Sequence, residues 1–459
     1  MEGDRRKTRY EQPALWDEAK GEALRDSRQG TEPPAASRET ESPAETRFLM
    51  EVVAGRENME KALKRVMANK GSPGADGMRV SELPGHLEAN WDEIKEQLLS
   101  GTYHPSPVRR VEIPKPNGGK RPLGIPTATD RLIQQAIAQV LTPIFDTGFS
   151  DASYGFRPGR SAHQATARAQ GYIEEGYAWV VDMDIEKFFD NVNHDALMAR
   201  VARKVADKRA LKIIRAFLNS GVMESGLTSP TDIGTPQGGP LSPLLSNVYL
   251  DDLDRELEKR GHRFVRYADD CNIYVKSERA GLRVMESLSR FLEKKLKLKV
   301  SVQKSAVTRP FRTSFLGFSF TWGSNPRRRI APKAIDRLKK RVRELTRRTR
   351  GISLEQMIAE LNRYLRGWRG YFGFCQTPSV LRDLDSWIRR RLRSFIWKQM
   401  KRGRRRFAEL TAQGVSKDLA AQTAGSTHGP WRLSRSPALH YAFKTAYFSA
   451  LGLISLEHG

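Results

Sequence analysis

The segment FVRYADDCNIYV, Phe264 to Val275, interrupts an apolar and aromatic sequence with two adjacent carboxylates, Asp269 and Asp270. The residues on both sides favour β-strands, so the segment predicts a hairpin with the aspartates at or near its tip. Adjacent like charges repel, and in a half-buried setting each carboxylate either takes up a proton or needs a cation. An exposed Asp-Asp turn, favoured only by turn chemistry, is the alternative, and this segment alone does not decide between the two.

A second acidic segment, WVVDMDIEKFFDNVNHDAL, begins at Trp179 and favours the cation. Its apolar start predicts a strand that places Asp182 and Asp184 on one face, and Asn193 or Asp195 is a plausible N-cap for the helix that follows. Carboxylates from a strand end and a hairpin tip can together form a site for two divalent ions, because hard cations such as Mg²⁺ prefer oxygen ligands. Two such ions, about 4 Å apart, can activate an attacking hydroxyl and stabilise a leaving pyrophosphate.

The composition predicts a soluble protein with a polyanionic partner. The chain has 459 residues, enough for two or three domains, and 39% of them are hydrophobic. Its net charge of +26, from 79 Lys and Arg against 53 Asp and Glu, exceeds what solubility requires. We find no apolar run of membrane-spanning length and no signal-peptide pattern, so we expect a cytoplasmic protein. The two cysteines, Cys271 and Cys375, lack the spacing of a zinc knuckle.

Changes in the sequence pattern predict the domain organisation. Residues 1–48 are rich in Pro, Ser, Glu and Arg without an apolar period, and we expect them to be disordered. From residue 49 onward, apolar residues recur at helical spacing. The segment TWGSNPRRRIAP, residues 321–332, predicts a domain boundary near 325, after which the chain becomes helical and strongly basic. A softer break follows residue 406.

Five segments, in order along the chain, resemble the palm motifs of a reverse transcriptase: VVDMDIEKFFD, GTPQGGPLSPLLSN, YADD, LKLKVSVQKS and FLGFSF. The similarity runs from residue 49 to the end and is greatest to bacterial group II intron-encoded proteins, especially those of intron class C. It implies an α+β right-hand polymerase. Fingers and palm, an antiparallel sheet plus helices, would occupy 49–325, an α-helical thumb (the maturase or X domain) 326–410, and a small C-terminal DNA-binding region 411–459.

By motif position, the resemblance assigns the catalytic and metal-binding roles to Asp184, Asp269 and Asp270. The implied cofactor is a pair of Mg²⁺ ions, with Mn²⁺ as a substitute. Asp182 shares a strand face with Asp184 but lies two residues early relative to the Phe-Phe pair that follows, so we expect Asp184 to be the ligand.

The family places an aromatic residue five positions after the catalytic aspartate, under the incoming sugar, where it excludes a 2′-hydroxyl. In this sequence, that position is Phe189. A core aromatic is the competing interpretation, and one side chain can serve both purposes. If Phe189 is the gate, the preferred substrate is a deoxynucleoside triphosphate.

The glycine-rich motif GTPQGGPLSPLLSN is expected to face the nucleotide. Its glycines allow close backbone approach, and Ser242 and Pro243 make a good helix start that would hold the loop rigidly. Such a loop could present Gln237 to the substrate. An ordinary Gly-rich connection is the alternative.

A basic hairpin is predicted upstream, in VRRVEIPKPNGGKRPLGIPT, with Asn117-Gly118 at its turn. Positive charge at its tip could neutralise charge on a triphosphate, and the resemblance assigns this role to Lys115 and Arg121. A solvated basic turn is the alternative.

Two later motifs complete the predicted polymerase site. Lys304, in VSVQKSAV, occupies the position where related polymerases carry a lysine proposed to protonate the leaving pyrophosphate. FLGFSF, residues 315–320, resembles the hairpin that holds the primer end and also fits a half-buried strand.

Residues 326–406 carry most of the charge excess, with 26 Lys and Arg against 6 Asp and Glu. Apolar residues of DLDSWIRRRLRSFIWKQM recur at helical spacing, so we expect Arg389, Arg390 and Arg393 to project outward and contact nucleic acid. The same role is expected for the arginines of RYLRGWRGYFGF, which are Arg363, Arg366 and Arg369. Phosphate contacts of this kind act independently of sequence, through counterion release. Most aromatics between these arginines are expected to be buried.

The resemblance implies an RNA-directed DNA polymerase that copies its intron RNA into DNA during retrohoming and binds that RNA to assist splicing. Its partners would be the intron RNA, an RNA template with a DNA primer or target, and deoxynucleoside triphosphates, in the bacterial cytoplasm near the nucleoid. No Cys- and His-bearing nuclease cluster follows residue 411, so we expect no endonuclease. Two alternatives stay open: a splicing cofactor with an idle palm, and a related reverse transcriptase used for defence or retron-like synthesis.

Overall fold

The computed structural model of the chain describes residues 46–114, 120–224, 227–229, 238–323 and 325–458. The disorder predicted for residues 1–45 and the turn predicted at Asn117-Gly118 lie outside this part. Thr46 is 3% exposed; its carbonyl accepts a hydrogen bond from Asp207 N at 3.1 Å, and its hydroxyl accepts one from Ala206 N at 3.2 Å. Because these bonds tie Thr46 to the fold, the prediction of disorder through residue 48 is wrong for Thr46.

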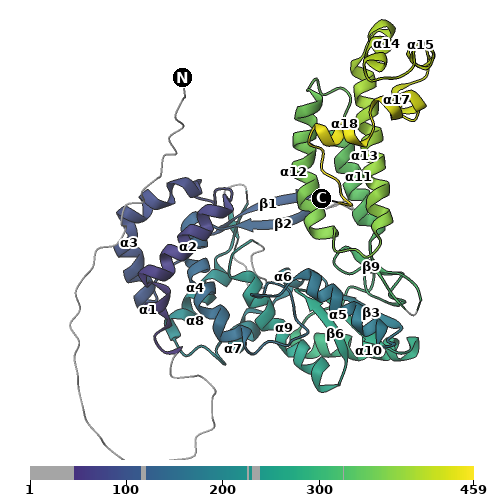
Figure 1. The fold of residues 1–459 in the computed structure, drawn as a ribbon. Helices are drawn as coiled ribbons and strands as arrows, with labels where there is room; N and C mark the ends of the chain where they lie inside the picture. Colours follow the sequence, from purple (N-terminus) through teal and green to yellow (C-terminus); the bar gives the residue numbers. More distant parts are fainter. Residues whose placement is uncertain (1–45, 115–119, 225–226, 230–237, 324, 459) are drawn as a thin grey trace, which may run out of the picture.

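Helices pack together at the N-terminal end of the described chain (Figure 1). They are α1 (Leu49–Val53), α2 (Arg56–Asn69), α3 (Leu83–Ser100), α4 (Ala128–Asp146) and α8 (Lys208–Asn219), with the 3-10 turn η2 (Val80–Glu82) before α3. Thr127 caps α4 by accepting a hydrogen bond from Asp130 N at 3.1 Å. The apolar stripes of these helices meet in the main core of the molecule.

The central sheet has the strand order β6-β7-β3-β8, with all neighbours antiparallel. Its strands are β3 (Trp179–Asp184), β6 (Arg263–Tyr267), β7 (Asp270–Val275) and β8 (Ala306–Thr308). The predicted hairpin is confirmed, since β6 and β7 pair with only Ala268 and Asp269 between them. Both predicted acidic segments therefore belong to one sheet.

Each face of this sheet is covered, because successive side chains point to opposite sides. One face enters the main core through residues such as Val181, Met183 and Ile273. The other joins a smaller apolar cluster that includes Val180, Val265 and Tyr274. The helices that pack on its strands are α5 (Ala162–Glu174), α9 (Ser242–Lys259) and α10 (Glu278–Phe291), which continues into the π-helical turn η3 (Leu292–Leu296). Helices α6 (Phe188–Asn191) and α7 (His194–Val201) follow β3 along the chain, and α7 packs on α9.

Two helix starts follow the predicted chemistry. Asn193, one of two candidate N-caps, begins α7, and its side chain accepts a hydrogen bond from Ala196 N at 2.8 Å. Helix α9 begins at Ser242 with Pro243 in its first turn, as predicted.

A second sheet has the order β2-β1-β4-β5. Its strands are β1 (Val108–Pro114), β2 (Lys120–Ile125), β4 (Val222–Glu224) and β5 (Leu227–Ser229). The predicted basic hairpin is confirmed as antiparallel pairing of β1 with β2, from Arg109 opposite Ile125 to Pro114 opposite Lys120. Figure 1 shows this hairpin extending away from the N-terminal helices.

The C-terminal part is helical, as predicted, and has its own apolar core, running from Ile330 to Leu456. Its helices are α11 (Pro332–Leu345), α12 (Leu354–Phe372), α13 (Pro378–Gln399), α14 (Gly403–Ala412), α15 (Lys417–Ala424), α16 (Pro430–Leu433), α17 (Pro437–Ala442) and α18 (Thr445–Ala450). A two-stranded ribbon, β9 (Phe318–Phe320) with β10 (Arg328–Ile330), precedes them. The expected boundary near residue 325 falls in the β9–β10 loop and stays a prediction.

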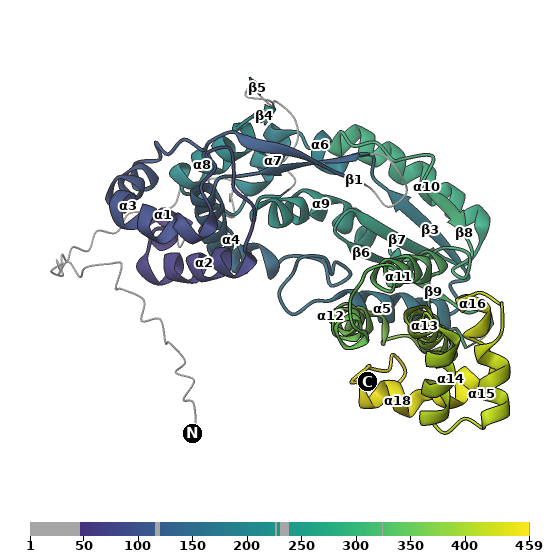
Figure 2. The ribbon, with the colours of Figure 1, turned by 90° about the horizontal axis from the view of Figure 1, so that it is seen from above.

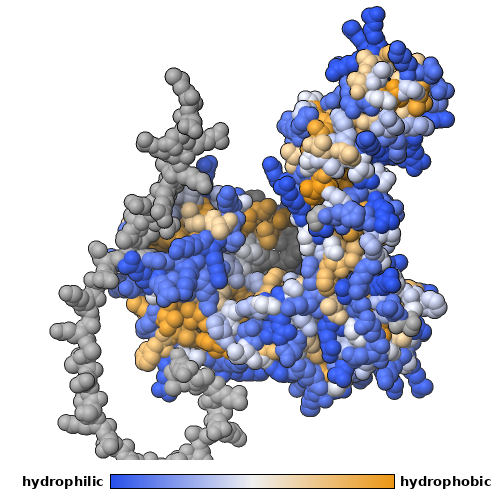
Figure 3. All heavy atoms as spheres, in the orientation of Figure 1, coloured by the Kyte–Doolittle hydropathy of each residue, from blue (hydrophilic) through white to orange (hydrophobic). Residues whose placement is uncertain are grey.

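The two parts of the molecule meet at the β9 turn. Tyr371 of α12 donates a hydrogen bond from its hydroxyl to Leu316 O at 2.8 Å, and His163 Nε2 of α5 lies 2.7 Å from Tyr371 O. Seen from above, the helical part curves back beside the sheets (Figure 2). The space-filling view shows a hollow between it and the N-terminal helices, with hydrophilic residues over much of the helical part (Figure 3). None of the helices in the described ranges has the length and hydropathy to cross a membrane.

Candidate active site

The two acidic segments meet inside the central sheet. In the pairing of β3 with β7, Asp184 lies directly opposite Asp270, and Asp182 lies opposite Asn272. Opposite residues in antiparallel strands have Cα atoms about 4.5 to 5.5 Å apart, so these carboxylates share one small volume. Asp269 occupies the turn that leads into β7. The predicted convergence of Asp184 with the hairpin tip is therefore confirmed.

Strand periodicity puts the carboxylates on one face. Asp182 and Asp184 alternate with the core residues Val181 and Met183, and Asp270 extends from the same side as its partner Asp184. An exposed Asp-Asp turn, the alternative interpretation, would not explain why Asp182, Asp184 and Asp270 lie on the same face of the sheet.

The electrostatics of the cluster favour a bound cation. Burial, together with the neighbouring charges of Asp182, Asp269 and Asp184, raises the pKa of Asp270 to about 7. Burial also raises the pKa of Asp182, with a contribution from Asp184. A divalent cation would offset both the repulsion and the burial cost, so the donor set is chemically suited to Mg²⁺ or Mn²⁺. Among the described residues, no group of three or more His, Cys, Asp or Glu side chains has the arrangement of a ready-made metal site.

Lys304 lies at the same site. Its Nζ is 3.1 Å from Asp184 Oδ1 and 3.3 Å from Oδ2. The chain beside it is fixed to the end of β3, because Ser301 N donates to Asp184 O at 2.8 Å and Asp184 N donates to Ser305 Oγ at 3.0 Å. The lysine and aspartate side chains are 65% and 38% exposed, so this ion pair is open to solvent and to substrate.

Asp182 has a different environment from Asp184. Thr313 donates a hydrogen bond from its hydroxyl to Asp182 Oδ2 at 2.6 Å, and the Asp182 carboxyl is directed toward the apolar cluster around Val180 and Tyr274. Asp184, by contrast, is at the strand end beside Lys304. The geometry agrees with the sequence-based choice of Asp184 as the ligand, which stays a prediction.

Phe189 is partly buried in α6, just beyond the end of β3. Its ring packs edge-on against Phe188 with centroids 5.2 Å apart, and it borders the main core. Phe188 is 2% exposed, so it is the core member of the pair. The partial exposure of Phe189 is compatible with both the gate and the packing interpretation.

The glycine-rich segment packs tightly against the basic hairpin and α4. A Cβ at Gly238 would lie 2.5 Å from Gly124 O of β2, and a Cβ at Gly239 would lie 2.2 Å from Gln134 Oε1. Both positions therefore have no room for a side chain, while the predicted approach of this loop to a nucleotide stays a prediction. Lys115 and Gln237 lie outside the described residues. Arg121 lies in β2, but its side chain is outside the described part.

The arginines of α12 differ in their contacts. Arg363 and Arg366 are exposed, whereas Arg369 donates from Nε to Leu456 O at 3.0 Å. Arg363 lines a cavity of about 780 Å³ beside the β9 turn, together with Leu316, Gly317, Arg337, Trp368 and Tyr371. Trp368 is 8% exposed, whereas Tyr364 and Tyr371 are half-buried, so the burial expected for most of these aromatics is confirmed only for Trp368. Arg363 and Arg366 therefore remain candidates for phosphate contact.

On α13, the prediction that Arg393 projects outward is wrong. Arg393 is 3% exposed and donates hydrogen bonds to Ser434 O and Phe443 O, both at 3.2 Å. Burial lowers its pKa to about 10, with smaller contributions from the charges of Arg389 and Arg390. The C-terminal helices cover this second face of α13, so the side chain is not available to a phosphate.

Arg389 and Arg390 remain partly exposed. Arg390 stacks over the Trp431 ring, with its guanidinium carbon 3.7 Å from the ring centroid, and donates to Trp431 O at 3.2 Å. These contacts hold α16 against α13 and orient the guanidinium, so Arg390 has a structural partner in addition to any nucleic acid.

Sequence reasoning missed several residues that support the acidic site. Thr313 and Ser305 touch the carboxyl-bearing strand, and Arg266 lies directly behind the aspartate turn. Their contacts depend on pairing between distant segments. The one available signal was a charged residue, Arg266, in the middle of an apolar strand.

Two family models match the chain. One, described as reverse transcriptase (RNA-dependent DNA polymerase), matches residues 113–320, and the other, described as group II intron, maturase-specific domain, matches residues 335–413. The first covers both acidic strands, and the second covers most of the basic helical part.

Individual relatives agree with these models. Protein YkfC of Escherichia coli (strain K12) is 32% identical over 299 residues, which cover 56% of this chain and 78% of that protein. The group II intron-encoded protein LtrA of Lactococcus lactis subsp. cremoris is 32% identical over 323 residues, which cover 56% of this chain and 54% of LtrA. The match thus spans about half of LtrA. The present chain belongs to the family of group II intron-encoded proteins that carry a reverse transcriptase domain followed by a maturase-specific domain.

Proposed function

We propose that this protein is an intron-encoded RNA-directed DNA polymerase that copies group II intron RNA into DNA during retrohoming and binds the intron RNA to assist splicing. The observation that carries the proposal is the pairing of Asp184 with Asp270, which gathers three carboxylates at one end of the sheet. The finer assignments to intron class C and to the bacterial cytoplasm near the nucleoid rest on the resemblance of the motifs.

In this proposal, Asp184, Asp269 and Asp270 hold two divalent ions through carboxylate oxygens. When bound, such ions lower the pKa of a primer 3′-hydroxyl and neutralise charge on the departing pyrophosphate. The positions of the carboxylates would determine where the primer 3′-hydroxyl and the triphosphate oxygens bind. Lys304 carries a proton at Nζ, within 3.1 Å of Asp184 Oδ1, and can deliver it to the pyrophosphate after leaving that carboxylate.

The incoming deoxynucleotide would be bound between the basic hairpin and the sheet. Lys115 and Arg121 of the hairpin neutralise triphosphate charge, Gln237 contacts the nucleotide, and Phe189 excludes a 2′-hydroxyl. Support comes from the tight packing of Gly238 against Gly124 of β2, which joins the glycine-rich loop to the hairpin.

The basic helical part would bind RNA and the template–primer duplex. Residues 49–325 would then be the fingers and palm, 326–410 the thumb, and 411–459 a DNA-binding region of a right-hand polymerase. Arg363, Arg366 and Arg389 are the phosphate contacts that exposure favours, with Arg369 and Arg390 shared between nucleic acid and the fold. In this proposal the duplex lies in the hollow beside the helical part (Figure 3).

Primer extension on an RNA template, with Mg²⁺ and deoxynucleotides, tests the proposal. Wild type should extend the primer, and Asp269→Asn should not. The matched control is Asp92→Asn, which changes an exposed acid on α3 and should extend normally. A wild-type protein that forms no product but accelerates intron splicing would leave only the splicing cofactor, and a polymerase without effect on splicing would have another role.

A further inference from the structure

The aspartate turn is held from behind by a buried arginine. We propose that Arg266 is a positioning residue: its guanidinium, anchored by Asp254 and Asn247 of α9, fixes the peptide between Ala268 and Asp269 and so sets where the two turn carboxylates lie. The inference rests on the proposed function, because it takes those carboxylates to be the ones that act on the nucleotide.

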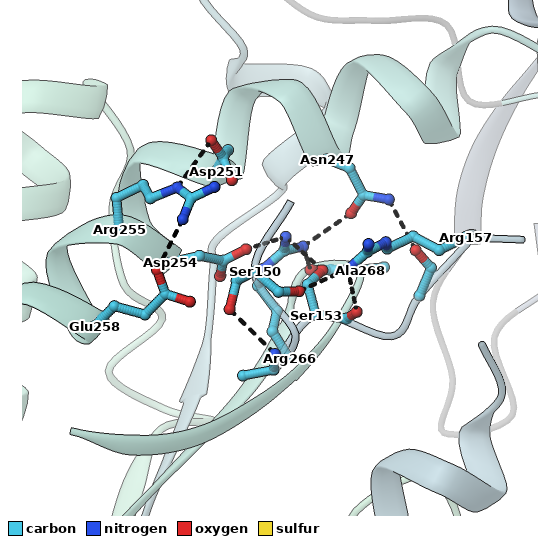
Figure 4. A network of polar contacts seen from close by, with 12 residues as sticks. Ser150, Ser153, Arg157, Asn247, Asp251, Asp254, Arg255, Glu258, Arg266 and Ala268 are labelled. Carbon is cyan, nitrogen blue, oxygen red and sulfur yellow. Dashed lines mark hydrogen bonds and ion pairs between the residues drawn. The ribbon is translucent and has the colours of Figure 1, made fainter. Parts of the chain in front are cut away.

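The Arg266 side chain is fully buried, and all five of its N–H donors have acceptors. Nε and Nη2 form a forked pair with the Asp254 carboxylate at 2.7 and 2.6 Å. Nη1 donates to Asn247 Oδ1 at 3.0 Å and to Ala268 O at 2.8 Å, and Nη2 also donates to Ser153 Oγ at 2.8 Å. Figure 4 shows these groups converging on one guanidinium. An arginine satisfied on every side has one orientation.

The contact with Ala268 matters most, because Ala268 has a left-handed backbone with φ of 58°. That conformation is unfavourable for a residue with a side chain and persists only where neighbours enforce it. The Ala268 carbonyl belongs to the same planar peptide as the Asp269 N–H. A donor that fixes this carbonyl therefore fixes the plane from which Asp269 extends.

A neighbouring loop closes the turn from the other side. A Cβ at Gly155 would lie 2.3 Å from Ala268 N, so the two backbones are in direct contact. Asn247 Nδ2 donates to Gly155 O at 2.8 Å, which holds the loop and the arginine with one side chain. Arg266 N also donates to Ala152 O at 2.9 Å. The turn is thus set by α9, β6 and this loop together.

The arginine and the carboxylates face opposite sides of the sheet. Arg266 is paired with Cys271, whose side chain is in the main core, whereas the neighbouring pair joins Tyr267 to Asp270. The network can therefore position the reacting groups without occupying their volume. Helix α9, which supplies Asp254 and Asn247, begins three residues after Gly239 of the glycine-rich segment, so the same rigid helix links both sides of the proposed nucleotide site.

The chemistry of the site requires arginine. Lysine keeps the charge but has a single nitrogen, so it cannot bridge the Asp254 carboxylate, Asn247 and the Ala268 carbonyl at once. A buried ion pair also stabilises a fold no more than apolar side chains of similar volume usually do. A role in positioning explains the pair better than a role in folding alone.

The test is single-turnover nucleotide addition by the full chain on a primer–RNA template, with Arg266→Lys compared with wild type below the melting temperatures of both. The amplitude reports the folded, active fraction, and the rate constant reports positioning. We expect the rate constant at saturating deoxynucleotide to fall at least tenfold and the Mg²⁺ concentration for half-maximal rate to rise several-fold. The Kd for primer–template should stay within twofold.

The matched control is Arg200→Lys, which alters another arginine paired with α9, through Asp252 at 2.9 Å. Its other contacts are with Ala196 O and the Tyr249 ring, away from the aspartate turn. It should keep the wild-type rate constant and Mg²⁺ dependence. If Arg266→Lys loses only amplitude, as a purely structural residue would, the inference is overturned. If Arg266→Lys does not fold, Gly155→Ala decides, because its added Cβ displaces the turn without changing charge and should lower the rate constant in the same way. A wild type without activity would instead defeat the proposed function.

Discussion

The central sheet and the helical part use charge in opposite ways. In the sheet, a few carboxylates are brought together by strand register, and burial raises the pKa of Asp270 to about 7. In residues 326–406, a net charge of +20, from 26 Lys and Arg against 6 Asp and Glu, is spread over long helices. A site built by register should fail when one member changes. A binding surface made of many separate basic side chains should lose only a little affinity when one of them changes.

The sharpest test of this contrast lies within the sheet, between the two acids of β3. Asp184→Asn should lower the rate of nucleotide addition by roughly 10³-fold, because losing a ligand of catalytic ions removes several kcal/mol of transition-state stabilisation. Asp182→Asn is the matched control and should stay within about tenfold, since Asp182 is held by Thr313. Equal losses in both variants would mean that the register does not select Asp184.

Phe189, just beyond the end of β3, tests whether the site formed by strand pairing also includes the aromatic residue next to it. Phe189→Val should reduce discrimination against ribonucleotides by roughly ten- to hundredfold, because a smaller side chain leaves space for a 2′-hydroxyl. Competition between deoxynucleotides and ribonucleotides in primer extension measures the ratio. Unchanged discrimination with a lower melting temperature would make Phe189 a packing residue.

Arg393 tests whether the helical part also contains charge fixed by its surroundings. Arg393→Gln should lower the free energy of unfolding of the helical part by about 2 kcal/mol, because it leaves the carbonyls of Ser434 and Phe443 without their buried donor. Denaturant unfolding gives this value. The Kd for RNA, measured on folded protein, should stay unchanged; a loss of affinity without a loss of stability would place Arg393 among the binding residues after all.

The smallest effect is expected from the exposed arginines. Arg363→Gln and Arg366→Gln should each weaken RNA binding a few-fold and reduce the slope of log affinity against log salt by about 0.7 to 0.9 per lost phosphate contact. Arg283→Gln, on the exposed side of α10, is the control. If the slopes of all three variants equal that of wild type, the phosphates are bound elsewhere.

The elements near the aspartates were predictable, because their signals are local. Strand-favouring apolar and aromatic residues on both sides of Asp269 predicted the hairpin, and Ser242 and Pro243 predicted the start of α9. The pairing of Asp184 with Asp270 joins segments far apart in the chain, so local reasoning alone could only suggest it.

The sequence-based predictions were wrong or incomplete where one helix or strand packs against two different parts of the chain. Periodicity along α13 defines one apolar stripe, but the C-terminal helices cover a second face, and this burial of Arg393 leaves no mark in a single-helix pattern. Arg266 was missed for a related reason: its partners come from α9 and from residues near Ser153, and only the folded chain brings them together.

The positions of bound cations test the role of the acidic cluster most directly. Anomalous scattering from crystals grown with Mn²⁺, a terminated primer on an RNA template and a deoxynucleotide should place two ions within about 2.6 Å of oxygens from Asp184, Asp269 and Asp270. Ions bound elsewhere, or none beside these carboxylates in a complex with ordered nucleotide, would contradict the assignment of this acidic cluster to polymerisation.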